Sequence, residues 1–234
     1  MHSPVVLVPG APVMVPELSG IAATDSAGPL EVVHGLIRDA HRDVTRVVVV
    51  GTDPAVRRLT GRSSTLGRWG ADVRVGRAGD PAATDAEVPD TCVIAWWLLD
   101  RAGSEVPRTF IGVAGGPGEA GTPGWASTLG EGDLVVVVAD GPASLSPRAP
   151  VPEDPRGVAL DSGLAAWLRD GGALPDPGAD TAEEIGWWSR PAWRLLDDLV
   201  GGAAARDAIS WAPFGVGYHA ARWDRRELTP GTRA

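Results

Sequence analysis

The sequence predicts a single α/β domain with a mostly parallel central sheet and helices on both faces. Val5 to Val8 and Arg46 to Val50 are short, continuous apolar runs, which are typical of strands buried on both faces. Between them, residues 30–43 carry apolar side chains at steps of three and four residues, which predicts an amphipathic helix. This order of strand, helix and strand has the length expected of a right-handed crossover between parallel strands.

The same alternation of strands and helices continues as far as residue 139. A short strand is expected at 72–75, a helix at 90–102, and strands at 109–113 and 133–139. The last of these contains four consecutive valines and is the clearest central strand. Alternating elements of this kind build a mostly parallel sheet that helices cover on both faces.

The C-terminal third begins with an irregular connection and ends with a strand. Residues 141–157 contain five prolines, which exclude regular structure across the segment. Helices are predicted at 157–169 and 181–199, and a closing strand is predicted within 208–223. The polar tail after Asp224 is expected to be frayed.

Composition favours one globular unit, a domain at 1–224 followed by the tail at 225–234. Of 234 residues, 44% are hydrophobic and 22% are charged, as in an average globular protein. The formal net charge is −9 and there is no lysine, so we expect neither nucleic acid nor a membrane as a partner. The single cysteine, Cys92, excludes an intramolecular disulfide, and we expect a buried, inert thiol. With no signal peptide or transmembrane helix predicted, a cytoplasmic location is expected.

Three features, in the same order along the chain, together resemble a known family. They are the turn Pro9-Gly10-Ala11-Pro12 after the first strand, the run VVVVGTDP at 47–54, and the pair VVVVADGPASLSPRAP at 135–150 with PFGVGYHAARW at 213–223. They are similar to segments of the class III extradiol ring-cleavage dioxygenases of the catalytic-subunit-B-like superfamily. This superfamily includes the protocatechuate 4,5-dioxygenase catalytic subunit, the Memo proteins and an uncharacterised actinobacterial branch, which this chain resembles most.

The resemblance implies an active site at the strand ends, but without the family's histidines. Active members hold Fe(II) with two histidines and a carboxylate, and a further histidine works as acid or base. In this sequence the three histidine positions fall on Gly10, at or beside Asp53-Pro54, and near Ser146-Pro147. The resemblance therefore implies a degenerate iron site and no ring cleavage. No cofactor is expected, and Fe(II) would bind only if the family's site is retained in altered form.

Three residues form the candidate catalytic set for an alternative hypothesis, an active oxidoreductase or other enzyme with a divergent site. Asp53 and Asp140 each follow a predicted parallel strand, at the edge where open α/β sheets bind ligands. Both could instead form turns or cap helices. His219, in the closing strand, is the best imidazole candidate, although it could equally be a core histidine with satisfied hydrogen bonds. The enzyme hypothesis predicts that the three side chains meet in one crevice.

Other candidates carry weaker signals. Ser144, Ser146 and Arg148 lie in the proline-rich segment and could hold an anionic ligand, although no G-x-S-x-G motif surrounds either serine. Gly116 to Gly121 matches G-x-G-x-x-G, but a Pro-Gly pair interrupts the helix that should follow, so we interpret it as a surface loop. His34 and His41 are seven residues apart, too far along a helix to share a metal ion, and we interpret them as partly exposed surface residues.

Ten tryptophans against two phenylalanines and one tyrosine is an unusual ratio. The pairs Trp96-Trp97 and Trp187-Trp188 fall on predicted helices, and two adjacent helical residues cannot both face one core. Exposed members could form the contact of a homodimer. Taken together, the sequence favours a small-molecule-binding or interaction protein without ring-cleavage activity, whose ligand the sequence does not identify.

Overall fold

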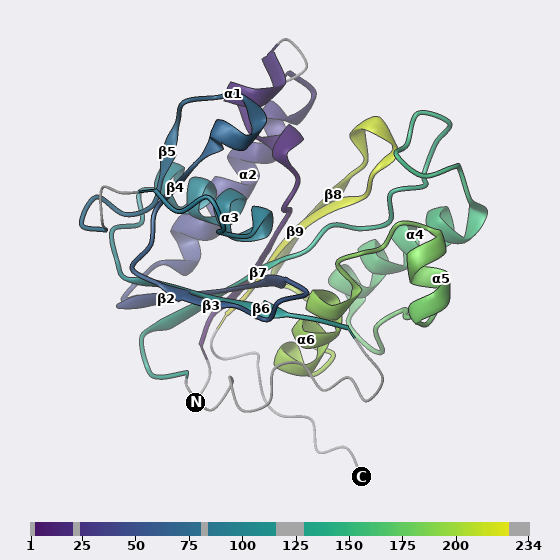
Figure 1. Ribbon diagram of the computed structural model, residues 1–234. Helices are drawn as coiled ribbons and strands as arrows, with labels where there is room; N and C mark the ends of the chain where they lie inside the picture. The colour runs from purple at the N-terminus through teal and green to yellow at the C-terminus, as the bar shows by residue number, and fades with distance from the viewer. Residues whose placement is uncertain (1–2, 21–23, 81–83, 116–128, 225–234) are drawn as a thin grey trace.

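The computed structural model describes residues 3–20, 24–80, 84–115 and 129–224, and its centre is a seven-stranded sheet (Figure 1). The strand order is β3-β6-β2-β7-β1-β9-β8. The four strands from β6 to β1 are parallel, whereas β3 at one edge and β9 and β8 at the other are antiparallel to their neighbours. The strands are β1 (Val5–Val8), β2 (Arg46–Thr52), β3 (Arg58–Thr60), β6 (Arg108–Val113), β7 (Asp133–Val138), β8 (Asp207–Trp211) and β9 (Tyr218–Trp223). The predicted α/β class is confirmed, with a parallel centre and antiparallel edges.

Two layers of helices cover the sheet, one on each face (Figure 1). The first layer holds α2 (Thr24–Ala40) and α3 (Asp90–Arg101), and the short α1 (Pro16–Ser19) lies before it in the chain. The second holds α4 (Pro155–Asp170), α5 (Ala179–Glu184) and α6 (Arg190–Val200). Among the described helices, none combines the length and apolar character that crossing a membrane requires.

The valine runs form the core because successive side chains enter opposite layers. In β7, Val136 packs with the α2–α3 layer, whereas Val135 and Val137 pack with the α4–α6 layer. The register places Val135 beside Val5 of β1 and Val48 of β2, which makes a continuous row across three strands. Each fully buried valine stabilises the fold by about 1.5–3 kcal/mol relative to an exposed one. The parallel centre is therefore the most strongly buried part of the protein.

Several local predictions differ from the structure. The strand expected at 72–75 is only β5 (Arg74–Val75), which pairs with β4 (Ser64–Thr65) in a separate two-stranded sheet. The helix expected at 181–199 is broken into α5 and α6. The break contains Gly186 at a φ of +69°, where a Cβ atom would lie 2.8 Å from Val151. A left-handed, closely packed position of this kind requires glycine and ends the helix.

The tryptophan pairs differ from each other. Trp96 and Trp97 are both buried, contrary to the prediction that one would be exposed, because α3 is covered on all sides and every residue from Cys92 to Leu99 is buried. Trp187 is buried and Trp188 is 53% exposed, so one member of this pair is exposed as predicted, but both lie in the break between α5 and α6 and not on a helix. The Cys92 thiol is buried as expected, and burial raises its pKa well above the ordinary value.

His34 is less exposed than predicted, whereas His41, in the turn after α2, is partly exposed as predicted. His34 is buried against Trp97, with ring centroids 5.9 Å apart, and burial lowers its pKa. This corrects the expectation of a surface residue. His41 is half-buried and its Nε2 atom lies 2.9 Å from the Ser104 hydroxyl. The G-x-G-x-x-G segment and the tail at 225–234 lie outside the described residues.

Candidate functional site

The carboxyl ends of the parallel strands lie along one edge of the sheet, as the sequence predicts. Asp53 follows β2 and Asp140 lies just beyond the end of β7. Because β9 is antiparallel to β1, its first residue, Tyr218, lies at the same edge. Two cavities open there, and Thr52 and Pro54 line both of them.

Asp53 is a buried anchor for the turn after β2. Its carboxylate accepts hydrogen bonds from the Arg57 guanidinium, at 2.7 Å from Nη2 and 3.0 Å from Nε, and from the Arg57 backbone N–H at 2.9 Å. The bond with the guanidinium keeps the pKa of Asp53 below its ordinary value, although burial opposes the shift. Asp53 is thus ionised and engaged within its own turn.

Asp140 has a different environment. One carboxylate oxygen accepts a 2.9 Å hydrogen bond from the backbone N–H of Gly10, and its backbone carbonyl accepts one of the same length from the Trp193 indole. Burial raises the pKa of Asp140 to about 6, and the bond from Gly10 opposes the shift. Burial and the charge of Asp140 also raise the pKa of Tyr218. Asp140 is therefore a carboxyl group that exchanges its proton close to neutral pH.

His219 lies on the other face of the sheet. Its Nε2 is 3.0 Å from the Asp161 carboxylate of α4, and its Nδ1 is 2.8 Å from the Ser210 hydroxyl of β8. The imidazole is fully buried and meets the edge of Trp193, with ring centroids 5.5 Å apart. It is a core histidine with both ring nitrogens engaged.

The structure does not bring Asp53, Asp140 and His219 together in one crevice. The contacts of His219 are with the α4–α6 layer, whereas a Cβ placed on Gly10 would have both Asp140 and Thr91 of α3 as neighbours. The physical reason is the alternation along β9, which turns His219 into the second helix layer and leaves Tyr218 on the face of the carboxylates.

The three residues proposed for anion binding do not form a site either. Ser144 is fully buried, and among the described residues its hydroxyl has no hydrogen-bond partner. The Ser146 hydroxyl accepts a bond from the backbone N–H of Arg148 at 3.3 Å, which stabilises a local turn. The Arg148 side chain is exposed, and none of the three residues lines either cavity.

The donors at the sheet edge do not fit the Fe(II) site that the family resemblance implies. At Gly10 an added Cβ would lie 2.8 Å from Cγ1 of the buried Val138, so the backbone leaves no room for a ligating side chain. Both oxygens of Asp53 accept bonds from Arg57, and Pro147 supplies no donor atom. Within the described part of the chain, no three histidine, cysteine, aspartate or glutamate side chains are grouped to hold a metal ion.

Comparison with known proteins leaves the family resemblance a prediction. Neither the models of protein families nor the curated proteins include a match to this chain.

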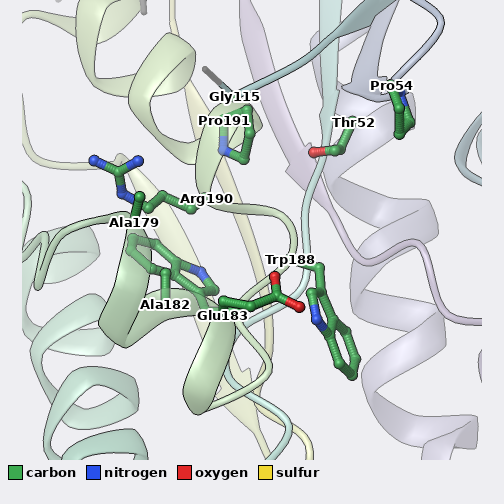
Figure 2. Close-up of a pocket in the computed structure, with 10 residues that line it drawn as sticks. Thr52, Pro54, Gly115, Ala179, Ala182, Glu183, Trp188, Arg190 and Pro191 are labelled. Atoms are coloured by element: carbon green, nitrogen blue, oxygen red, sulfur yellow. The ribbon is translucent and has the colours of Figure 1, made fainter. Parts of the chain in front are cut away.

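The larger cavity, about 540 Å³, lies between the sheet edge and the break that separates α5 from α6 (Figure 2). The sequence did not predict this cavity, because it forms only where the fold packs the break between α5 and α6 against the end of β2. The sequence signal that could have indicated the helix break is Gly186, which directly precedes two tryptophans. Its lining is mostly apolar and comprises Thr52, Pro54, Gly115, Ala179, Ala182, Glu183, Trp187, Trp188, Arg190 and Pro191.

Few polar groups line this cavity, and two of them are unsatisfied. The Thr52 hydroxyl and the Trp187 indole N–H are buried and have no hydrogen-bond partner among the described residues. Figure 2 shows the Thr52 hydroxyl and the Glu183 carboxylate directed toward the space between them. The Arg190 guanidinium extends away from Thr52 and binds Asp176, with contacts of 2.7 and 2.8 Å.

The smaller cavity, about 370 Å³, opens on the side of α3 and is polar. The two arginines that line this cavity already form ion pairs with aspartates. Arg57 binds Asp53, and Arg68 binds Asp90 at 2.5 Å. A ligand would have to compete with these ion pairs, so the larger cavity is the better candidate for a binding site.

We expect Gly10→Ala to lower the free energy of unfolding by about 1–2 kcal/mol, because a stiff, buried valine must move to admit the methyl group. The matched control is Gly35→Ala within α2, where a Cβ meets nothing within 4 Å. This control should stabilise the protein by about 0.5–1 kcal/mol. Urea denaturation of both variants measures the difference, and equal effects would contradict the close packing at Gly10.

Asp140 should make stability depend on pH. Because its pKa is raised when folded, its protonated form is favoured in the native state, and stability is lost as pH rises from about 4 through 6. Asp140→Asn keeps an acceptor for Gly10 and removes the charge. The variant should therefore gain stability relative to the wild type over this range, by at most about 3 kcal/mol. Urea denaturation at pH 4, 5, 6 and 7.5 tests this, and a difference that does not change with pH would disprove it.

Proposed function

We propose that this chain is an extradiol-dioxygenase-like protein that binds a small molecule at the edge of its sheet and does not cleave aromatic rings with Fe(II). The observation that carries the proposal is the larger cavity beside Thr52. It lies where open α/β sheets bind their ligands, outside the carboxyl ends of the strands.

The properties of the cavity support binding. Its volume of about 540 Å³ falls within the range of small-molecule sites, which are mostly apolar with a few convergent polar groups. Leaving a buried donor or acceptor unsatisfied costs about 1–3 kcal/mol. The Thr52 hydroxyl and the Trp187 N–H are closed off from solvent, so a side-chain movement has to expose them before a ligand can bond to either and recover part of this cost.

The enzyme alternative has less support. Asp53 is neutralised by Arg57, and His219 is held between Ser210 and Asp161 on the opposite face. The raised pKa of Asp140 suits acid or base chemistry, but Asp140 lines neither cavity. A binding role needs none of these groups.

Iron loading tests the second half of the proposal, the absence of Fe(II)-dependent ring cleavage. After anaerobic incubation with Fe(II) and removal of free metal, we expect well below one iron per chain and no oxygen uptake with catechol or protocatechuate. Metal analysis and an oxygen electrode measure the two quantities. Stoichiometric iron together with oxygen uptake would disprove this half.

Binding at the cavity is tested with 2-phenylethanol, a neutral aromatic probe. In protein labelled with ¹⁵N at the indole nitrogens, the Trp187 and Trp188 signals should shift on titration. The signals of Trp167 and Trp223 should not shift, because neither residue lines the cavity and both N–H groups stay bonded to backbone carbonyls.

Trp188→Ala should weaken this binding several-fold, because an exposed indole that lines the cavity is lost. The matched control is Phe214→Ala, which removes an exposed aromatic ring that does not line the cavity and should leave affinity unchanged. No shift at Trp187 or Trp188 with millimolar probe would count against a binding function.

A further inference from the structure

We infer that the ligand of the larger cavity carries a cationic amine on an apolar or aromatic body. This inference rests on the proposed function, because it concerns the same cavity. The charges around the cavity and its indole rings favour this class of ligand.

The charge in the cavity comes from Glu183. Its carboxylate lines the cavity, and among the described residues it forms no ion pair. Its neighbour Glu184 shows the contrast, since it binds Arg156 at 2.7 Å and does not line the cavity. Glu183 is therefore an anion directed toward the cavity and available to a ligand.

Arg190 also lines the cavity, but its positive charge does not balance the negative charge of Glu183. Arg190 binds both oxygens of Asp176, and the side chain of Arg194 lies 3.8 Å from the same carboxylate. In Figure 2 the Arg190 guanidinium lies on the side away from Trp188, whereas the Glu183 carboxylate lies on the same side as Trp188. An anionic ligand would meet Glu183 without a compensating arginine, so the cavity selects against it.

Two indole rings strengthen the preference for a cation. Trp187 and Trp188 both line the cavity, but Trp187 is buried, so Trp188 offers the accessible ring; the face of an indole is the best aromatic partner for an ammonium group. A carboxylate beside aromatic rings is the arrangement that recognises amines. The net charge of −9 adds a weak, salt-dependent attraction for cations over the whole molecule.

The rest of the cavity defines the body of the ligand. Pro54, Ala179, Ala182 and Pro191 provide an apolar lining that suits a ring or short hydrocarbon chain. The Thr52 hydroxyl lies on the sheet side, apart from Glu183, and is closed off from solvent, so the ligand class does not depend on it. The ligand class is therefore a primary or substituted amine with an apolar body.

A matched series of probes tests this inference. The probes are 2-phenylethylamine, 2-phenylethanol and 3-phenylpropionate, which have similar bodies and carry positive, neutral and negative charge. Titrations followed by the indole signals should give the order amine, alcohol, carboxylate. We expect the amine to bind about tenfold more tightly than the alcohol at low salt, and the advantage to shrink as salt is added.

The variant Glu183→Gln should weaken amine binding about five- to tenfold and change alcohol binding less than about twofold. Glu184→Gln is the control and should alter neither. Circular dichroism and the midpoint of thermal unfolding confirm that both variants fold.

The outcomes separate the two proposals. Equal binding of all three probes at Trp187 and Trp188, or tighter binding of the carboxylate, would overturn the amine inference and leave the binding function standing. The same holds if Glu183→Gln has no effect on the amine. If none of the three probes shifts the Trp187 and Trp188 signals, the binding function itself fails.

Discussion

Burial of the parallel strands on both faces is the constraint on which the rest of the structure depends. The valine run of β7, buried on both faces, needs a helix layer on each side, and the charged residue of this strand, Asp133, stands at its first position. Polar chemistry is therefore confined to the strand ends. This is why Asp53, Asp140 and both cavities lie at one edge of the sheet.

Trp193 of α6 links that edge to the second helix layer. Its indole donates to the carbonyl of Asp140 and packs against His219, while the Asp140 carboxylate accepts from the backbone of Gly10. These contacts join β1, β7, β9 and α6 at a single point. Asp140 and His219 are thus close to the same tryptophan and yet face different layers. Two polar residues that contact the same tryptophan therefore need not belong to the same site.

The sequence allowed the α/β class, the valine-rich strands and the strand-end edge to be predicted, because these follow from local patterns of apolar residues. The burial of His34 and Trp97 could not be predicted, since it depends on how completely α2 and α3 cover each other and the sheet. The binding cavity was missed for a related reason. Its indoles come from a helix break that a periodic pattern does not show, and only the fold places that break against Thr52.

The two faces of the sheet edge differ in what they can hold. Gly10 and Asp53, where the family resemblance would place iron-binding residues, lie on the α3 side, where Arg57 binds Asp53 and Val138 fills the space beside Gly10. That side is closed by packing and ion pairs. The larger cavity lies across β2, next to α5 and α6, and is lined by indoles and a carboxylate. In the proposed binding function, the ligand therefore lies across the end of β2 from Gly10 and Asp53, where indoles and a carboxylate are present and the parallel strands have ended.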